Sequence, residues 1–81
     1  MSPAAVKERL RGEHFHPFRI VTTSGTTYDV RHPELVMVGL GELVIGIPSK
    51  EDATIAQATH RVPLRHVVRL EPLEEATTAS N

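Results

Sequence analysis

Apolar and polar residues alternate through residues 17–34, PFRIVTTSGTTYDVRHPE, on both sides of a Ser-Gly step. A period of two is typical of strands with one buried face, and a turn-forming step between two such runs indicates a β-hairpin. A strict two-residue loop at Ser24 and Gly25 mixes core and solvent residues on each face, whereas one added loop residue sorts the faces cleanly. The pattern therefore predicts a bulged turn with Gly25 at positive φ.

In this register the directly opposed residues are Phe18 with His32, Ile20 with Val30, and Thr22 with Tyr28. The same register places Arg19 opposite Arg31 on the solvent face. We expect Asp29, on that face, to moderate the repulsion between the two arginines.

The N-terminal segment predicts a short helix. Ser2 is a good N-cap, Pro3 suits the first helical position, and Gly12 suits the C-terminal stop. Val6 and Leu10 are four residues apart and therefore share one helix face. A helix of about nine residues is not stable alone, so it has to dock through this face onto the sheet.

The rest of the chain predicts strands over 35–38 and 42–47 with a glycine turn between them, a weaker edge strand over 54–61, a helical turn over 63–66 and a last strand over 67–71. Residues 1–73 are thus expected to form a single domain, and the small, polar residues 74–81 a disordered tail. Five or six short strands with these two helices predict a mainly β fold, a small SH3-like or Sm-like barrel.

Two of these strands do not alternate, because residues 35–38 are LVMV and residues 43–45 are LVI. Both faces of these strands therefore carry apolar side chains. In one assignment the inward set is Leu35, Met37, Leu43 and Ile45, and the outward set is Val36, Val38 and Val44. The reverse assignment also leaves an apolar set outside. Each such side chain contributes ~1.5–3 kcal/mol when buried, so we expect it to be covered.

The sequence leaves three possibilities for what covers these outward apolar side chains. The N-terminal helix covers the outer residues through Val6 and Leu10, or a second subunit covers them by face packing or by strand addition at a barrel edge. The third is another protein or an apolar ligand. The residues predicted for a subunit interface are Val36, Val38 and Val44 in its buried part and His32, Pro33 and Glu34 at its rim.

The size and composition favour self-association. Eighty-one residues without cysteine hold one core and exclude disulfides and thiolate metal sites. A chain of this size buries only ~60–65% of its extended surface, and small chains without such staples often gain stability as homo-oligomers. Nine basic and ten acidic residues are interspersed, so composition shows no basic stripe for nucleic acid.

The lengths of the apolar segments indicate the cellular compartment. All are well under the ~18 residues that a membrane-spanning helix needs. The N-terminus carries charge where a signal peptide would place its apolar segment. A cytoplasmic protein without a membrane partner is therefore expected.

Candidate chemistry is sparse. Ser24 lies in a turn without the strand–Ser–helix context of a nucleophile elbow, and Asp29 and Glu42 are isolated carboxylates. We therefore predict that the protein is not an enzyme and uses no cofactor. Among five histidines, His14 and His16 share a face in extended backbone and are weak candidates for a metal site. Solvent-facing or hydrogen-bonded histidines are the main expectation, with no native metal.

The chain resembles a family of short, uncharacterised bacterial proteins in four segments. These are FHPFRI at 15–20, the Ser24-Gly25 step, VRHPE at 30–34 and VVRLEP at 67–72. The resemblance covers Leu10 to Leu73 and implies a fold and a compartment but no activity. More loosely, the order of helix and barrel resembles Sm and Hfq-type RNA-binding ring proteins. The chain lacks their pocket of Asp and Asn and their second glycine motif, and it lacks the aromatic groove of SH3 domains.

The first functional hypothesis is a non-enzymatic, self-associating scaffold or protein-interaction module. The alternative is Sm-like RNA binding, with phosphate contacts from Arg19, Arg31, Arg61, Arg65 and Arg69. Phosphate contacts weaken steeply with salt, whereas an apolar interface does not, so ionic strength separates the two. A second alternative is histidine-mediated metal binding.

Overall fold

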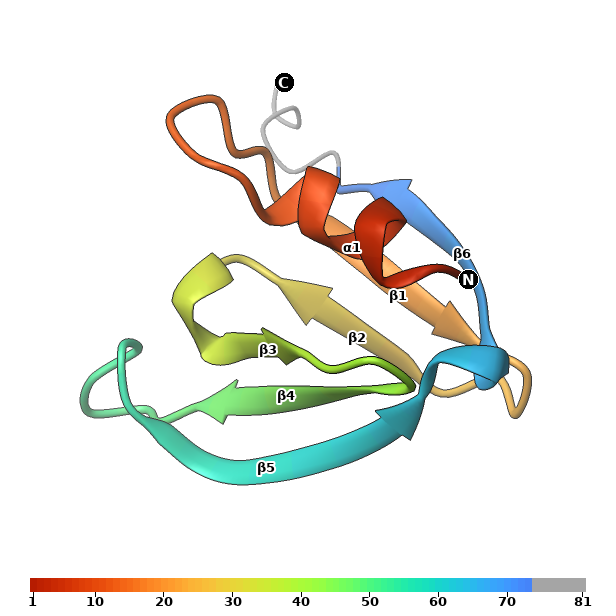
Figure 1. Cartoon of the computed structure of the whole chain (residues 1–81). Coiled ribbons are helices and arrows are strands. Elements are labelled where there is room, and N and C mark those ends of the chain that lie inside the picture. Colours follow the sequence, from red (N-terminus) through yellow and green to blue (C-terminus); the bar gives the residue numbers. More distant parts are fainter. Residues whose placement is uncertain (74–81) are drawn as a thin grey trace, which may run out of the picture.

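The computed structural model describes residues 1–73, and the predicted tail over 74–81 lies outside them (Figure 1). The elements are α1 (Pro3–Leu10), β1 (Phe18–Thr22), β2 (Thr27–Val30), the 3-10 turn η1 (Pro33–Leu35), β3 (Val36–Val38), β4 (Glu42–Pro48), β5 (Ala56–Pro63), the 3-10 turn η2 (Leu64–His66) and β6 (Val67–Pro72). The mainly β composition, the six strands, the N-terminal helix and the helical turn before the last strand are confirmed.

The strands form two antiparallel sheets of three, with the orders β2-β1-β6 and β3-β4-β5. No backbone ladder joins the two sheets within residues 1–73, so the expected closed barrel is wrong. The break lies between β2 and β3, where η1 begins at Pro33. Proline fixes φ and has no N–H to donate, so the chain does not run through as one bent strand that belongs to both sheets.

The hairpin of β1 and β2 keeps the predicted faces but not the predicted register. Phe18 opposes Val30 and Ile20 opposes Tyr28, a shift of two residues. The loop holds three residues, as expected, but it starts one residue earlier, at Thr23, and ends at Gly25 with φ 94°. In a three-residue hairpin the last loop position is the left-handed one, which glycine adopts at least cost. The positive φ predicted for Gly25 is confirmed, and its place in the loop sets the register.

Helix α1 follows the predicted capping. Ser2 Oγ accepts a hydrogen bond from the Ala5 amide at 3.2 Å, and Gly12 adopts φ 51° after the helix ends. Val6 is the buried residue of α1, with no exposed surface. The helix touches both sheets, because it contacts β3 and places the Arg9 guanidinium 6.0 Å from the centre of the Phe18 ring in β1. Docking of α1 therefore helps to close the core between the sheets.

The inner faces of both sheets supply the core. Its buried apolar residues are Val6, Phe18, Ile20, Val30, Leu43, Ile45, Val62, Leu64 and Val67. The partner strand decides which side of β3 joins this core: Val36 opposes Ile45 and Val38 opposes Leu43. Directly opposed residues share a face. Of the two assignments left open by the sequence, the first therefore holds for β4 and the reverse holds for β3.

The outer face of the β3-β4-β5 sheet keeps the remaining apolar residues. Met37 opposes Val44 there, and the Met37 side chain is 68% exposed. The predicted edge strand over 54–61 is observed as β5, shifted by two residues, and it pairs with β4 alone among the described strands. The expectation that an apolar set stays outside is met by Met37 and Val44.

Candidate interaction surfaces

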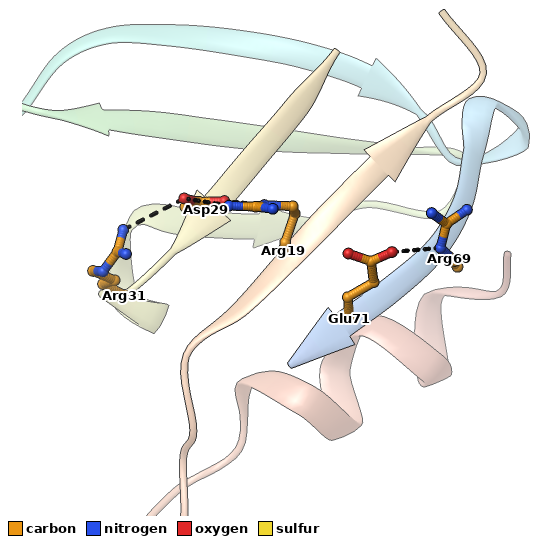
Figure 2. Close-up of polar contacts among 5 residues, drawn as sticks. All are labelled: Arg19, Asp29, Arg31, Arg69 and Glu71. Carbon is orange, nitrogen blue, oxygen red and sulfur yellow. Dashed lines mark hydrogen bonds and ion pairs between the residues drawn. The ribbon is translucent and has the colours of Figure 1, made fainter. Parts of the chain in front are cut away.

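A row of alternating charges crosses the outer face of the β2-β1-β6 sheet (Figure 2). Arg19 stands between Asp29 on β2 and Glu71 on β6 in the strand register. Its Nε donates to Asp29 Oδ1 at 2.7 Å and its Nη2 to Asp29 Oδ2 at 3.3 Å. Arg31 lies 3.6 Å from the same carboxylate, and Arg69 Nε donates to Glu71 at 2.6 Å. The predicted opposition of Arg19 and Arg31 is wrong, and Asp29 bridges the two arginines.

Ionisation in this row follows from the hydrogen bonds. The bond from Arg19 lowers the pKa of the Asp29 carboxyl from its ordinary value, and the positive charges of Arg19 and Arg31 act in the same direction. The hydrogen bond to Asp29 and its negative charge raise the pKa of Arg19. Both groups are therefore held in their charged forms at neutral pH.

The five arginines predicted to contact phosphate do not form one basic surface. Arg19, Arg31 and Arg69 lie in the charge row with two carboxylates, and Arg61 Nη2 pairs with Glu42 Oε2 at 3.1 Å on the other sheet. Arg65 in η2 is exposed and has no ion pair within residues 1–73. Because carboxylates repel phosphate, the described surface offers no continuous track for a nucleic acid backbone.

The residues predicted for a subunit interface lie in two different environments. Val36 and Val38 pack against the core and line a hollow of about 430 Å³ beside α1, together with Pro33 and Leu10. Val44 is half-buried on the opposite face of the sheet. Their role in a contact between subunits stays a prediction, as does that of the rim residues His32 and Glu34, whose Nδ1 and Oε2 atoms lie 3.9 Å apart.

The sequence pattern missed two exposed apolar side chains. One of the two open assignments places Met37 inward with Leu43, and Leu40 is expected only as part of a glycine turn, yet the two residues are 68% and 96% exposed. A signal for Leu40 was present, because a large apolar residue between Gly39 and Gly41 has no strand partner to bury it.

Each three-stranded sheet has two edge strands, and β5 and β6 are one edge strand of each sheet. In the order β3-β4-β5, β5 is hydrogen-bonded on one side, and its eight residues make it the longest strand described. Its residues from Gln57 to Arg61 are all exposed. In the other sheet β6 is likewise an edge, with Val68 49% exposed. An edge of this kind presents unpaired N–H and C=O groups to a second chain.

The five histidines, all within residues 1–73, do not form a single cluster. His14 and His16 line one shallow hollow with Glu8, and His60 Nδ1 lies 3.3 Å from the Tyr28 hydroxyl with the rings edge to face. Within residues 1–73 no three His, Asp or Glu side chains are placed to hold one metal ion. The Tyr28–His60 contact joins β2 to β5 and so links the two sheets through side chains where no backbone ladder does.

No helix in residues 1–73 is long and apolar enough to cross a membrane. Comparison of the chain with models of protein families, with curated proteins and with solved structures gives no significant match. The surfaces above are therefore interpreted from their geometry and chemistry alone.

Proposed function

We propose that the protein is a non-enzymatic module that associates with copies of itself through the free edge of β5. The observation that carries this proposal is the length and exposure of that edge: eight residues, paired with β4 alone among the described strands. Antiparallel strand addition would satisfy the outward N–H and C=O groups of β5 with those of a second chain.

The side chains of β5 support pairing rather than prevent it. Soluble proteins usually protect edge strands with charged side chains, above all lysine, and with bulges or prolines. Residues 56–60 of β5 are AQATH, without a lysine or proline, and Pro63 stands only at the far end. The one bulge in this ladder lies near the start of β5: Ile47 opposes Ala58 and Pro48 opposes Ala56, so Gln57 is an extra residue and the pairing is regular from Ala58 to Pro63.

The neighbouring outer face extends the contact. Met37 and Val44 lie on the same sheet as β5 and are incompletely covered within one chain. A second copy that pairs along β5 and also packs over this face would remove apolar surface from water, which contributes about 25 cal/mol per Å². A domain of this size buries only a small hydrophobic core, so association with a second copy adds to its stability.

The order of the elements supports an Sm-like or SH3-like architecture for this module. An N-terminal helix precedes the strands, β1 pairs with β6, and a helical turn joins β5 to β6. The RNA-binding alternative gains no comparable support, because four of its five arginines already face carboxylates within the chain.

Light scattering coupled to gel filtration tests the proposal. The monomer has a mass of 8.9 kDa, and the native protein is expected to elute at a multiple of it, with the fraction of oligomer rising with concentration. The double variant Gln57→Lys with Thr59→Lys puts two charges on the exposed edge and is expected to elute as a monomer. The matched control, Ala4→Lys with Ala5→Lys, carries the same charges on exposed positions of α1 and should keep the native mass.

Two results would contradict self-association through β5. One is a native protein of 8.9 kDa at every concentration. The other is an oligomer that survives lysines on β5. The salt dependence separates the alternative function: retention of mixed RNA on a filter that falls steeply with salt would favour phosphate contacts over an apolar interface.

A further inference from the structure

The hollow of about 430 Å³ beside α1 lies against β3, and we call it the α1–β3 groove. Its apolar lining consists of Leu10, Pro33, Val36, Met37 and Val38. Its charged lining residues are Lys7 and Arg11, and no Asp or Glu of residues 1–73 lines it. The α1–β3 groove therefore combines an apolar lining with charge of one sign, which is positive.

Helix geometry places Lys7 on the side of α1 that faces β3. Successive helix residues are about 100° apart, so Lys7 and Arg9 flank the face formed by Val6 and Leu10 on its two sides. Arg9 takes the side of β1, where its guanidinium lies 6.0 Å from the centre of the Phe18 ring. Lys7 takes the other side and makes no hydrogen bond or ion pair within residues 1–73. Its charge is therefore available to a ligand in the groove.

The hairpin of β3 and β4 determines which backbone groups of β3 are used. The Gly39 amide donates to the Glu42 carbonyl at 2.8 Å, which makes Gly39 and Glu42 a hydrogen-bonded pair. Hydrogen-bonded and non-hydrogen-bonded pairs alternate along an antiparallel ladder. Met37 and Val44, two residues further on, are therefore also a hydrogen-bonded pair. The residues on either side of Met37 direct their N–H and C=O groups away from β4.

These two residues are Val36 and Val38, which line the α1–β3 groove. The Val36 amide donates to the Pro33 carbonyl, as expected for a group that points away from β4. The Val36 carbonyl and both backbone groups of Val38 make no backbone hydrogen bond within residues 1–73. The free edge of β3 therefore offers one donor and two acceptors to an added strand.

We propose that the α1–β3 groove binds a short, extended peptide in which acidic and apolar residues alternate, and that the peptide pairs antiparallel with β3. Directly opposed residues share a face, so apolar peptide residues opposite Val36 and Val38 would meet the apolar lining. The carboxylates complement Lys7, and no acidic residue in the lining repels them. A small apolar molecule would leave the Val38 N–H without a partner, whereas a peptide backbone satisfies it.

This contact is separate from self-association through β5. In the order β3-β4-β5 the two strands are opposite edges of one sheet. The double variant Gln57→Lys with Thr59→Lys alters β5 alone, so it is expected to lose self-association and to keep its affinity for the peptide. Each of the two proposals can therefore fail without the other.

Fluorescence anisotropy of a labelled synthetic peptide, EVEVE, tests the site with the full chain. The peptide KVKVK reverses the charges and keeps the valines. A third peptide keeps the sequence EVEVE but has both valine amides N-methylated, which removes the donors that would face β3. Saturable binding of EVEVE, about tenfold tighter than that of either control, is expected. Equal affinity of the N-methylated peptide or of KVKVK, or no saturable binding of EVEVE, would overturn the proposal.

Hydrogen exchange and one substitution locate the bound peptide. EVEVE should slow exchange of the Val38 amide and leave the Met37 amide, already paired with β4, unchanged. Lys7→Gln is expected to weaken affinity about threefold, the effect of one exposed charge pair. The matched control, Lys50→Gln, removes an equal charge from an exposed residue outside the groove and should keep native affinity. Unchanged Val38 exchange at saturation, or equal effects of the two lysine substitutions, would exclude this site.

Discussion

Arg19 and Asp29 lie directly opposite each other on β1 and β2, and two hydrogen bonds of 2.7 and 3.3 Å join the guanidinium to both carboxylate oxygens. Arg19 also opposes Glu71 on β6. The arginine at the centre of the sheet therefore faces an acidic residue on each neighbouring strand. Cross-strand pairs of opposite charge stabilise a sheet, and the two-point geometry fixes both side chains.

A double-mutant cycle measures this pair. With side chains 40% and 30% exposed, Arg19 and Asp29 are expected to show a small favourable coupling in the free energy of unfolding. Urea denaturation of the native protein, Arg19→Gln, Asp29→Asn and the double variant gives the coupling. The control cycle pairs Asp29→Asn with Arg65→Gln and should give none. A coupling of zero for Arg19 and Asp29 would show that solvent screens the pair completely.

The same pair predicts how stability depends on acid. The pKa of Asp29 is lower in the folded chain than its ordinary value of 3.8 because Arg19 hydrogen-bonds the charged form. A depressed folded pKa stabilises the protein above the unfolded pKa, and this contribution disappears as the pH falls through the folded value. Urea midpoints should therefore fall from pH 5 to pH 2 less steeply in Asp29→Asn than in the native protein. Equal slopes would contradict the prediction.

Gly25 is expected to be costly to replace for a conformational reason. Its φ is 94°, and an added Cβ would meet no atom within 4 Å. Gly25→Ala should therefore lower the free energy of unfolding by about 1–2 kcal/mol through backbone strain alone. Gly41→Ala is the control, because Gly41 has equal space around it and no positive φ. Equal denaturant midpoints for the two variants would contradict a strained turn.

The hairpin shows what alternation determines and what it does not. Alternation assigned Phe18, Ile20 and Val30 correctly to the inner face, but registers two residues apart produce the same faces, so it did not choose between them. Turn chemistry decides, because glycine is needed at the last loop position. Charge gave a second signal: the correct register replaces a repulsive Arg19–Arg31 opposition with an attractive Arg19–Asp29 pair.

The interaction surfaces were less predictable. In β3 and β4 both faces are apolar, so only the pairing of Val36 with Ile45 shows that Val36 points inward and Met37 outward. A hollow beside the β1–β2 turn is lined by residues of the run TTSGTT at 22–27 and by Arg61 and His66, which are more than thirty residues away in sequence. The run was visible, but its partners depend on how η2 packs against the turn.

Gly46 is expected to be costly to replace for a different reason, a close approach. A Cβ there would lie 3.0 Å from the Ala56 Cβ, 3.1 Å from the Leu35 carbonyl oxygen and 3.3 Å from the Leu35 Cβ. Two of these neighbours belong to η1, so the backbone itself would have to move. Gly46→Ala should lower the free energy of unfolding by about 1–3 kcal/mol, and thermal or urea unfolding beside Gly41→Ala measures it. An unaltered midpoint would mean that η1 shifts without cost.

Docking of α1 depends chiefly on Val6, the buried residue of a helix too short to persist alone. Val6→Ala removes two methyl groups from a fully buried site and should lower the free energy of unfolding by about 1.5–3 kcal/mol. Lys7→Ala, an exposed substitution in the same helix, is the control and should change it little. If α1 is what covers Val36 and Val38, Val6→Ala should also raise the binding of an apolar dye under native conditions. Equal stability and equal dye binding in the two variants would show that α1 does not hold the core closed.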